Sequence, residues 1–135
     1  MFYRMKLKIN TMANNALLKK WKVIRAQKLN IIGRLVLENY GEIIIGNNVK
    51  IISDFASNVI GGYQKTKIYC RNGASLLIGN NVGISNSIIT AYESIIIEDD
   101  AAIGAGCLIT DSDHHSLVYD LRRGGGHRRS GTNYY

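Results

Sequence analysis

The chain has 135 residues, which is enough for one domain with its own hydrophobic core. Hydrophobic residues make up 46% and charged residues 20%, as in ordinary globular proteins, and no apolar run is long enough to span a membrane. The net charge of +7 is carried by the two ends, because residues 35–121 alone have a net charge of −6, and this acidic body argues against a nucleic-acid-binding domain.

The first element is a basic segment, residues 1–30, in which nine Lys and Arg occur up to residue 34 without any acid. We expect a helix from Thr11 to Leu29 in this segment, since apolar residues recur there on one face. Two roles are open for the helix: it caps the first coil of the following domain, which we prefer because the apolar stripe is short, or it lies on an anionic lipid surface. The apolar face contains Leu17, Trp21 and Ile24, flanked by Leu18 and Leu29.

Three segments of the next region, residues 41–51, 74–84 and 93–103, repeat one pattern, and a partial fourth unit follows at 103–109. An aliphatic residue recurs every six positions, and corners such as Gly46-Asn47-Asn48 contain residues that tolerate left-handed backbone conformations. A period of six fits neither an amphipathic helix nor a hairpin. It predicts short strands that each end in a corner. The aliphatic residues expected to point inward are Ile45, Ile51, Ile78, Ile84, Ile97, Ile103 and Ile109.

This pattern resembles the hexapeptide repeat of left-handed parallel β-helices, and Ile45–Lys50, Ile78–Gly83 and Ile97–Ala102 match it fully. The resemblance covers residues 31–121. It implies an all-β domain, a left-handed parallel β-helix of about three coils, preceded by the basic helix. The 33 positions from Ile45 to Ile78 exceed one coil, so we expect an insert within Ser53–Lys65.

Two further alignments come from the same repeat. Leu35 and Leu37 occupy the places of Ile68 and Cys70 in the next copy. Cys107 occupies the small slot of Ile103–Leu108, so we expect both cysteines to be core residues rather than nucleophiles. Two cysteines are too few for a disulfide framework, which favours a reduced, cytoplasmic setting, with membrane association through the N-terminal helix left open.

The polar segment Thr110–Ser116 directly follows the last good repeat and contains two histidines. It resembles the catalytic segment of hexapeptide O-acetyltransferases that act on maltose, galactosides and capsular polysaccharides. The polysaccharide-modifying branch aligns His115 with the catalytic base, which is the alignment that we prefer, and the shorter pattern of the other enzymes aligns His114. Imidazole suits a base for acyl transfer, and a carboxylate on its far nitrogen would orient it. Asp113 and Asp111 are available for that role.

The resemblance implies an enzyme that transfers an acetyl group from acetyl-CoA to a hydroxyl of a sugar or surface polysaccharide precursor, without a metal. It also implies a homotrimer with active sites between neighbouring subunits. Two other interpretations are open. The chain is a non-catalytic β-helical scaffold that binds partners, or it is a zinc enzyme using His114, His115 and His127, which we disfavour because adjacent strand residues point to opposite sides.

The last 14 residues, 122–135, hold four Arg and four Gly without Ile, Leu or Val, and no repeat resumes there. We expect this tail to be disordered. Relatives continue with further coils that help to form the coenzyme A site. We therefore expect this chain to be a truncated or frame-shifted copy that binds acetyl-CoA poorly and turns over slowly.

Overall fold

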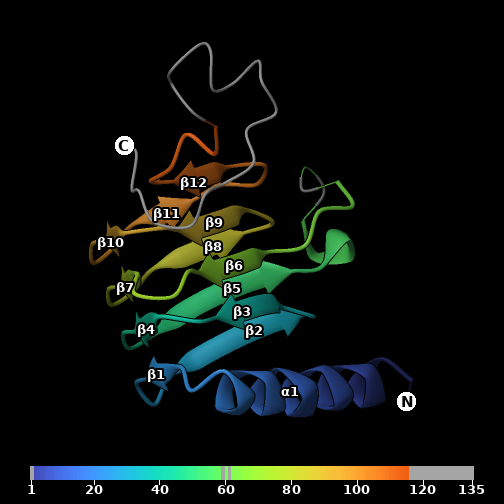
Figure 1. Cartoon of the computed structure of the whole chain (residues 1–135). Coiled ribbons are helices and arrows are strands. Elements are labelled where there is room, and N and C mark those ends of the chain that lie inside the picture. Colours follow the sequence, from blue (N-terminus) through green and yellow to red (C-terminus); the bar gives the residue numbers. More distant parts are fainter. Residues whose placement is uncertain (1, 59, 61, 116–135) are drawn as a thin grey trace.

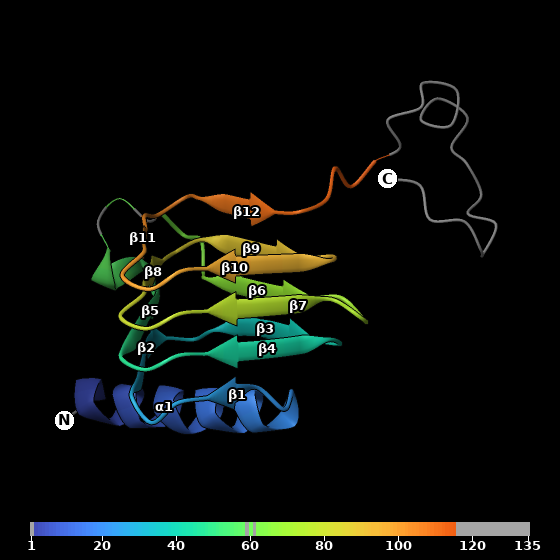
Figure 2. The same cartoon turned by 90° about the vertical axis from the view of Figure 1, so that its left-hand side faces the viewer.

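The computed structural model describes residues 2–58, 60 and 62–115. In this part of the chain, one helix, α1 (Phe2–Lys20), is followed by short strands that form three parallel sheets of four strands each. The backbone winds upward in left-handed coils, and each coil gives one strand to each sheet, as Figures 1 and 2 show from two sides. The predicted fold, a left-handed parallel β-helix behind a basic helix, is confirmed.

Each of the three sheets contains the strands that hold the same place in successive coils. The first sheet contains β1 (Ile24–Arg25), β4 (Glu42–Ile45), β7 (Ser75–Ile78) and β10 (Ser94–Ile97). The second contains β2 (Leu29–Gly33), β5 (Val49–Ser53), β8 (Gly83–Ser85) and β11 (Ala102–Ile103). The third contains β3 (Val36–Asn39), β6 (Lys67–Cys70), β9 (Ile88–Ala91) and β12 (Leu108–Thr110).

The interior is an aliphatic stack, as the six-residue period predicts. Five of the seven predicted inward residues, Ile45 to Ile97, are at most 7% exposed, and the last two, Ile103 and Ile109, are half-buried against the same core. The recognised repeats form the three coils that begin at β4, β7 and β10. Residues 24–39 add a further coil between these and α1.

The corners after the first sheet stack on one another through polar side chains. The N–H of Asn47 donates to Oδ1 of Asn80 at 2.8 Å, and the N–H of Asn80 donates to Oδ1 of Asp99 at 2.6 Å. The backbone and side-chain N–H groups of Asn80 hold the pKa of Asp99 below its ordinary value. A Cβ at Gly46 would lie 2.6 Å from the backbone of Gly79, which explains the glycine at this corner.

The N-terminal helix differs from the predicted Thr11–Leu29, because it begins at Phe2 and ends at Lys20. Its end is a Schellman motif: the N–H of Val23 donates to the Leu18 carbonyl, and the N–H of Lys22 donates to the Lys19 carbonyl. Lys22 has the left-handed φ of 51° that this motif requires. No helix in the described residues has an apolar stretch long enough to cross a membrane.

Because the helix stops early, two residues expected on or beside its apolar face belong to strands instead. Ile24 lies in β1 with its side chain 55% exposed, and Leu29 begins β2, half-buried against the core. The β-branched pair Val23-Ile24 favours extended backbone over helix at this point.

Helix α1 lies across the base of the coil stack and caps the first coil, the role that the sequence analysis preferred (Figures 1 and 2). Leu18 is 3% exposed and belongs to the core cluster. Asn14, also 3% exposed, donates from Nδ2 to the Gly33 carbonyl at 2.9 Å and accepts from the N–H of Leu35 at 3.2 Å. The capping helix therefore satisfies polar backbone groups as well as covering apolar side chains.

The insert lies where the sequence predicts it, between Ser53 at the end of β5 and Lys67 at the start of β6, and contains the short 3₁₀ helix η1 (Phe55–Ser57). The upstream alignment is wrong by two residues. Leu37 pairs with Ile68, and Asn39 pairs with Cys70. The reason is that the corner after β6, residues 71–74, is two residues longer than the corner after β3, residues 40–41.

Candidate functional site

The candidate segment leaves the last described coil directly from the third sheet. Thr110 is the final residue of β12 and stacks on Thr90 of β9. Residues 111–115 then turn away from the sheet, so the segment lies at the opposite end of the stack from α1 (Figure 2). The strand fixes Thr110, and the residues after it depend on their own contacts for position.

Asp111 is clamped onto the coil below it. Its carboxylate accepts the backbone N–H groups of Tyr92, Glu93 and Ser94 at 2.6, 2.8 and 2.7 Å. Burial acts to raise the pKa of this carboxyl, but the three N–H donors outweigh burial and hold the pKa of Asp111 below its ordinary value. Asp111 is thus an ionised anchor for the start of the site, and within the described residues its carboxylate bonds to backbone N–H groups rather than to a histidine.

A compact turn follows the anchor. The N–H of Ser112 donates to Oγ1 of Thr110 at 3.3 Å, and the N–H of His114 donates to Oγ of Ser112 at 3.1 Å. His114 has a φ of 59°, in the left-handed region that non-glycine residues seldom adopt. Hydroxyl groups therefore supply the bonds that hold this local conformation.

The ring of His114 has a defined place. It meets the ring of Tyr92 edge to face, with centroids 4.9 Å apart and planes at 87°. Its Nε2 lies 3.1 Å from Oγ1 of Thr110, where either atom is able to donate according to the histidine tautomer. Although the side chain is exposed, an aromatic contact and a hydroxyl contact restrict its orientation.

The other two predicted catalytic residues are placed differently. His115 and Asp113 are exposed, and neither side chain makes a hydrogen bond with any residue in the described part of the chain. The structure thus brings Thr110, Ser112 and His114 together with Tyr92, whereas it does not bring Asp113 to His115. Among the residues that the structure describes, none bonds to the ring nitrogens of His115.

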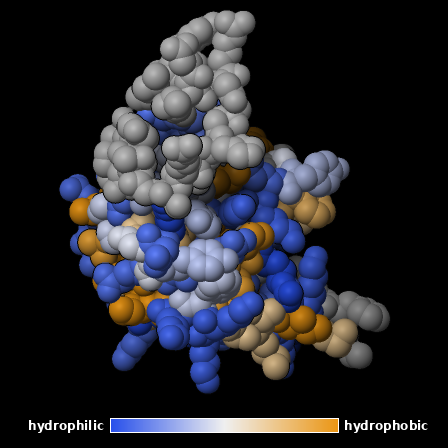
Figure 3. All heavy atoms as spheres, viewed as in Figure 1, coloured by the Kyte–Doolittle hydropathy of each residue, from blue (hydrophilic) through white to orange (hydrophobic). Residues whose placement is uncertain are grey.

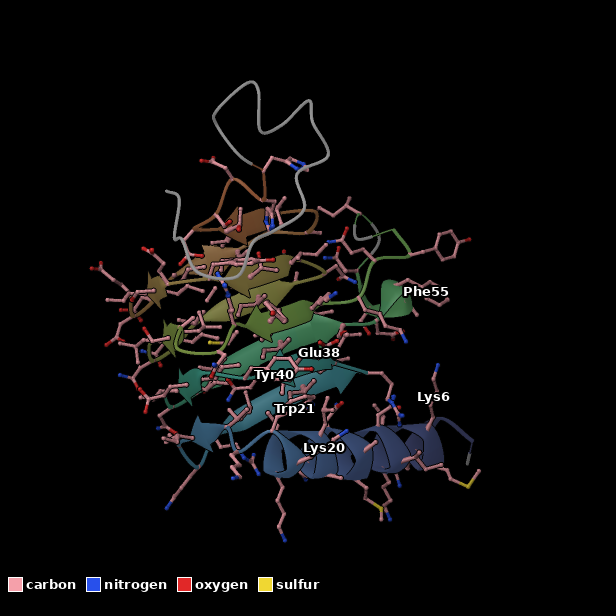
Figure 4. The ribbon with its side chains drawn as sticks, in the orientation of Figure 1. Lys6, Lys20, Trp21, Glu38, Tyr40 and Phe55 are labelled. Carbon is pink, nitrogen blue, oxygen red and sulfur yellow. The ribbon has the colours of Figure 1, made fainter. Side chains whose placement is uncertain are left out.

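A column of aromatic rings that the repeat pattern did not predict runs from Trp21, directly after the capping helix, to this site. Trp21 meets Tyr40 at 5.1 Å between centroids, Tyr40 meets Tyr69 at 6.1 Å, and Tyr69 meets Tyr92 at 5.8 Å. Figure 4 shows Tyr40 above Trp21, with Glu38 on the same face. One signal was available: Tyr40 and Tyr92 each stand three residues before a buried isoleucine, Ile43 and Ile95.

The two cysteines have different surroundings. Cys70 is fully buried, as predicted, and its thiol donates to the carbonyls of Ala74 at 3.4 Å and Glu42 at 3.6 Å. Burial raises the pKa of the Cys70 thiol, which makes it a poor nucleophile. Cys107 was expected in the core, and this is wrong, because its side chain is exposed. It lies in the last described coil, where the other inward positions are also less well covered.

The zinc alternative is not supported by the residues whose positions are described, since no three His, Cys, Asp or Glu side chains converge among them. His127, its third candidate ligand, lies outside the described residues, as do Ser116 and the whole tail 122–135.

The site thus offers one oriented imidazole, one exposed imidazole and several hydroxyl groups at the end of a rigid stack. This set is able to move a proton between a bound hydroxyl and a leaving group. Comparisons with protein-family models, with curated proteins and with solved structures gave no match, so the functional argument rests on these residues and on the fold.

Proposed function

We propose that this chain is an O-acetyltransferase that moves an acetyl group from acetyl-CoA to a hydroxyl of a sugar or a surface polysaccharide precursor. The observation that supports it is the histidine pair, His114 and His115, held by an anchored turn where the chain leaves the last strand of a left-handed β-helix. The hexapeptide pattern that resembles the acetyltransferases gave the correct fold, which supports the same resemblance for the site.

In the proposed reaction the acceptor hydroxyl oxygen attacks the thioester carbonyl carbon while an imidazole nitrogen takes the hydroxyl proton. The tetrahedral intermediate then collapses, the C–S bond breaks, and the imidazolium returns its proton to the departing sulfur. The products are the acetyl ester and free coenzyme A. Neither cysteine takes part in this direct transfer, consistent with the burial of Cys70.

We assign the base to His115, with His114 as the alternative and Asp113 as the orienting carboxylate. The free ring of His115 supports this choice, since a base must reach the substrate proton. His114 is engaged with Tyr92 and Thr110 and would position the turn beside it. In this arrangement Asp113 meets His115 only when substrate is bound, because catalytic hydrogen bonds often tighten in the substrate complex.

The test is thiol release from acetyl-CoA, measured with a panel of acceptor sugars for the wild type and for His115→Ala. Loss of a general base is expected to lower kcat/KM about a hundredfold or more. His114→Ala, Asp113→Asn and Tyr92→Phe are run beside it, and Tyr92→Phe is the matched control because it retains the ring that His114 contacts.

The outcomes separate the assignments. Activity that survives His115→Ala but not His114→Ala moves the base to His114. Activity that survives both histidine variants contradicts this site, and a wild-type chain with no thiol release for any sugar favours the non-catalytic scaffold. The observation that favours this second candidate is that Asp113 makes no hydrogen bond to His115 in the described part of the chain.

We further propose that the chain assembles as a homotrimer through the outer face of the first sheet. Four aliphatic residues stack there in register, one per coil: Ile24, Ile44, Leu77 and Ile96. Three of them are 41–65% exposed, and hydrophobic side chains gather along the left edge of Figure 3, where this sheet lies in Figure 1. Light scattering should give three times 15.0 kDa, and Leu77→Lys should shift it towards monomer. A wild-type monomer contradicts the proposal.

A further inference from the structure

Helix α1 has two opposite faces, and the coil stack covers only one of them. The covered face contains Asn14 and Leu18 and makes the cap described above. The uncovered face contains Met5, Ile9, Met12 and Ala16, which recur at intervals of four, three and four residues and so lie on one side of the helix. Met5, Ile9 and Met12 are 51%, 52% and 72% exposed.

This uncovered face is flanked by cations. Lys8 and Lys19 adjoin the Met5–Met12 stripe on one side by helical spacing, Lys20 adjoins it on the other, and all three are exposed. Lys20 also lies 5.3 Å from the Trp21 ring, whereas Lys6 points up along the side of the β-helix in Figure 4. The helix contains no acidic residue, so nothing on α1 itself offsets these charges.

The position of the helix makes this face accessible to a flat surface. Helix α1 lies across the end of the coil stack, and its uncovered side points away from the strands (Figures 1 and 2). An apolar stripe with lysines on both sides is the arrangement of helices that lie in the interface of an anionic bilayer. A nucleic acid would be attracted by the lysines but would leave three large apolar side chains in water.

From this geometry we infer that α1 is a bilayer-binding surface, on which Met5, Ile9 and Met12 enter the headgroup region and Lys8 and Lys19 contact anionic lipids. The inference is independent of the proposed acyl transfer. A chain bound in this way carries its histidine pair at the end of the stack that faces away from the lipid.

The experiment is vesicle flotation of the full 135-residue chain with phosphatidylcholine vesicles, with and without phosphatidylglycerol. The wild type is expected to float with anionic vesicles and to be released by high salt. The triple variant Met5→Gln/Ile9→Gln/Met12→Gln should bind about tenfold or more weakly. Each of Lys8→Gln and Lys19→Gln should weaken binding about fivefold.

Matched controls come from other exposed positions. Lys50→Gln/Lys67→Gln removes two charges from the coil stack, one more than either single lysine variant of α1. Ile60→Gln removes an aliphatic side chain that is 84% exposed in the insert. Both controls should float like the wild type. Circular dichroism is recorded for each variant. Met12→Trp adds a second readout, because emission from residue 12 should shift to the blue on vesicles whereas wild-type Trp21 should not shift.

Three results would overturn the inference: wild-type chain that stays unbound with anionic vesicles, apolar variants that bind like the wild type, or control lysines that matter as much as Lys8 and Lys19. The triple variant is also compared with the wild type for binding to double-stranded DNA. If both retain DNA equally and the triple variant binds vesicles like the wild type, α1 is a general polyanion-binding surface instead.

Discussion

The two ends of the coil stack are built from similar strands but differ in how well they are covered. At the base, Leu35 and Leu37 are 5% and 3% exposed, because α1 covers the first coil. At the other end, the inward residues Ile103 and Ile109 are only half-buried. Each coil contacts only its neighbours, so an inward residue is fully buried only where something lies on both sides of it. The repeat thus determines which side chains point inward, and the neighbouring coils determine how deeply those side chains are buried.

This difference divides the roles of the two ends. The base combines apolar burial with satisfied backbone groups, as Asn14 illustrates, and it contributes stability. The far end carries the histidine pair on a turn that hydroxyl groups and one carboxylate hold in place. Under the proposed function, the histidine pair lies at the less well covered end, and ligand-binding segments are commonly found in the less stable parts of a fold.

The largest expected loss of stability comes from truncating an isoleucine in a middle coil, compared with the same truncation in the last coil. Ile68 is fully buried between coils, so Ile68→Ala should lower the free energy of unfolding by about 3–4 kcal/mol. The same truncation at half-buried Ile109 should cost about 1 kcal/mol. Urea unfolding of both variants measures the difference. Equal costs would mean that the last coil is covered as well as the middle one.

The cap should give the next largest effect. Leu18→Ala removes the helix residue that enters the core, and we expect a loss of about 2–3 kcal/mol in unfolding free energy. Met12→Ala is the matched control on the same helix, since its side chain is 72% exposed and should cost less than about 0.5 kcal/mol. If the two variants are equally stable, α1 does not act as a cap in solution.

The smallest expected loss of stability comes from replacing Asp111, the anchor of the candidate site, and this loss depends on pH. Asp111→Asn should cost about 1–2 kcal/mol at neutral pH, because an amide replaces a carboxylate that accepts three N–H groups. The pKa of Asp111 is depressed in the folded state, so its stabilisation is complete above the unfolded pKa of about 3.9 and is lost as pH falls through the lower folded pKa.

The difference in stability between the wild type and Asp111→Asn should therefore stay constant around neutral pH and narrow only in acid. Denaturant unfolding at a series of pH values measures this. A difference that grows as the pH falls would show that the sign, and thus the role of the carboxylate, is wrong.

The coils were predictable because the aliphatic period and the Gly-Asn-Asn corners are local signals that one sequence displays. The end of α1 could not be predicted, because Lys22 adopts the left-handed conformation at a position where glycine usually marks the end of a helix. The register upstream of Ile68 was missed because corner lengths differ between coils. At the site, the sequence pointed to the correct segment, but the partners of Asp111 and His114 come from residues 92–94, which only the coil stacking brings near.

The insert between β5 and β6 has a consequence for chain entropy. The coil that contains the insert brings Ile84 into register with Ile51, 33 positions earlier. The next coil has no such insert and brings Ile103 into register with Ile84, 19 positions earlier. The cost of closing a flexible loop grows only with the logarithm of its length, so the longer closure costs about 0.5 kcal/mol more. Ser53 and Thr66 join the two ends of the insert through the Thr66 N–H, which donates to the Ser53 hydroxyl at 3.0 Å. The length of this loop is therefore nearly free to change while the coils on either side keep their register.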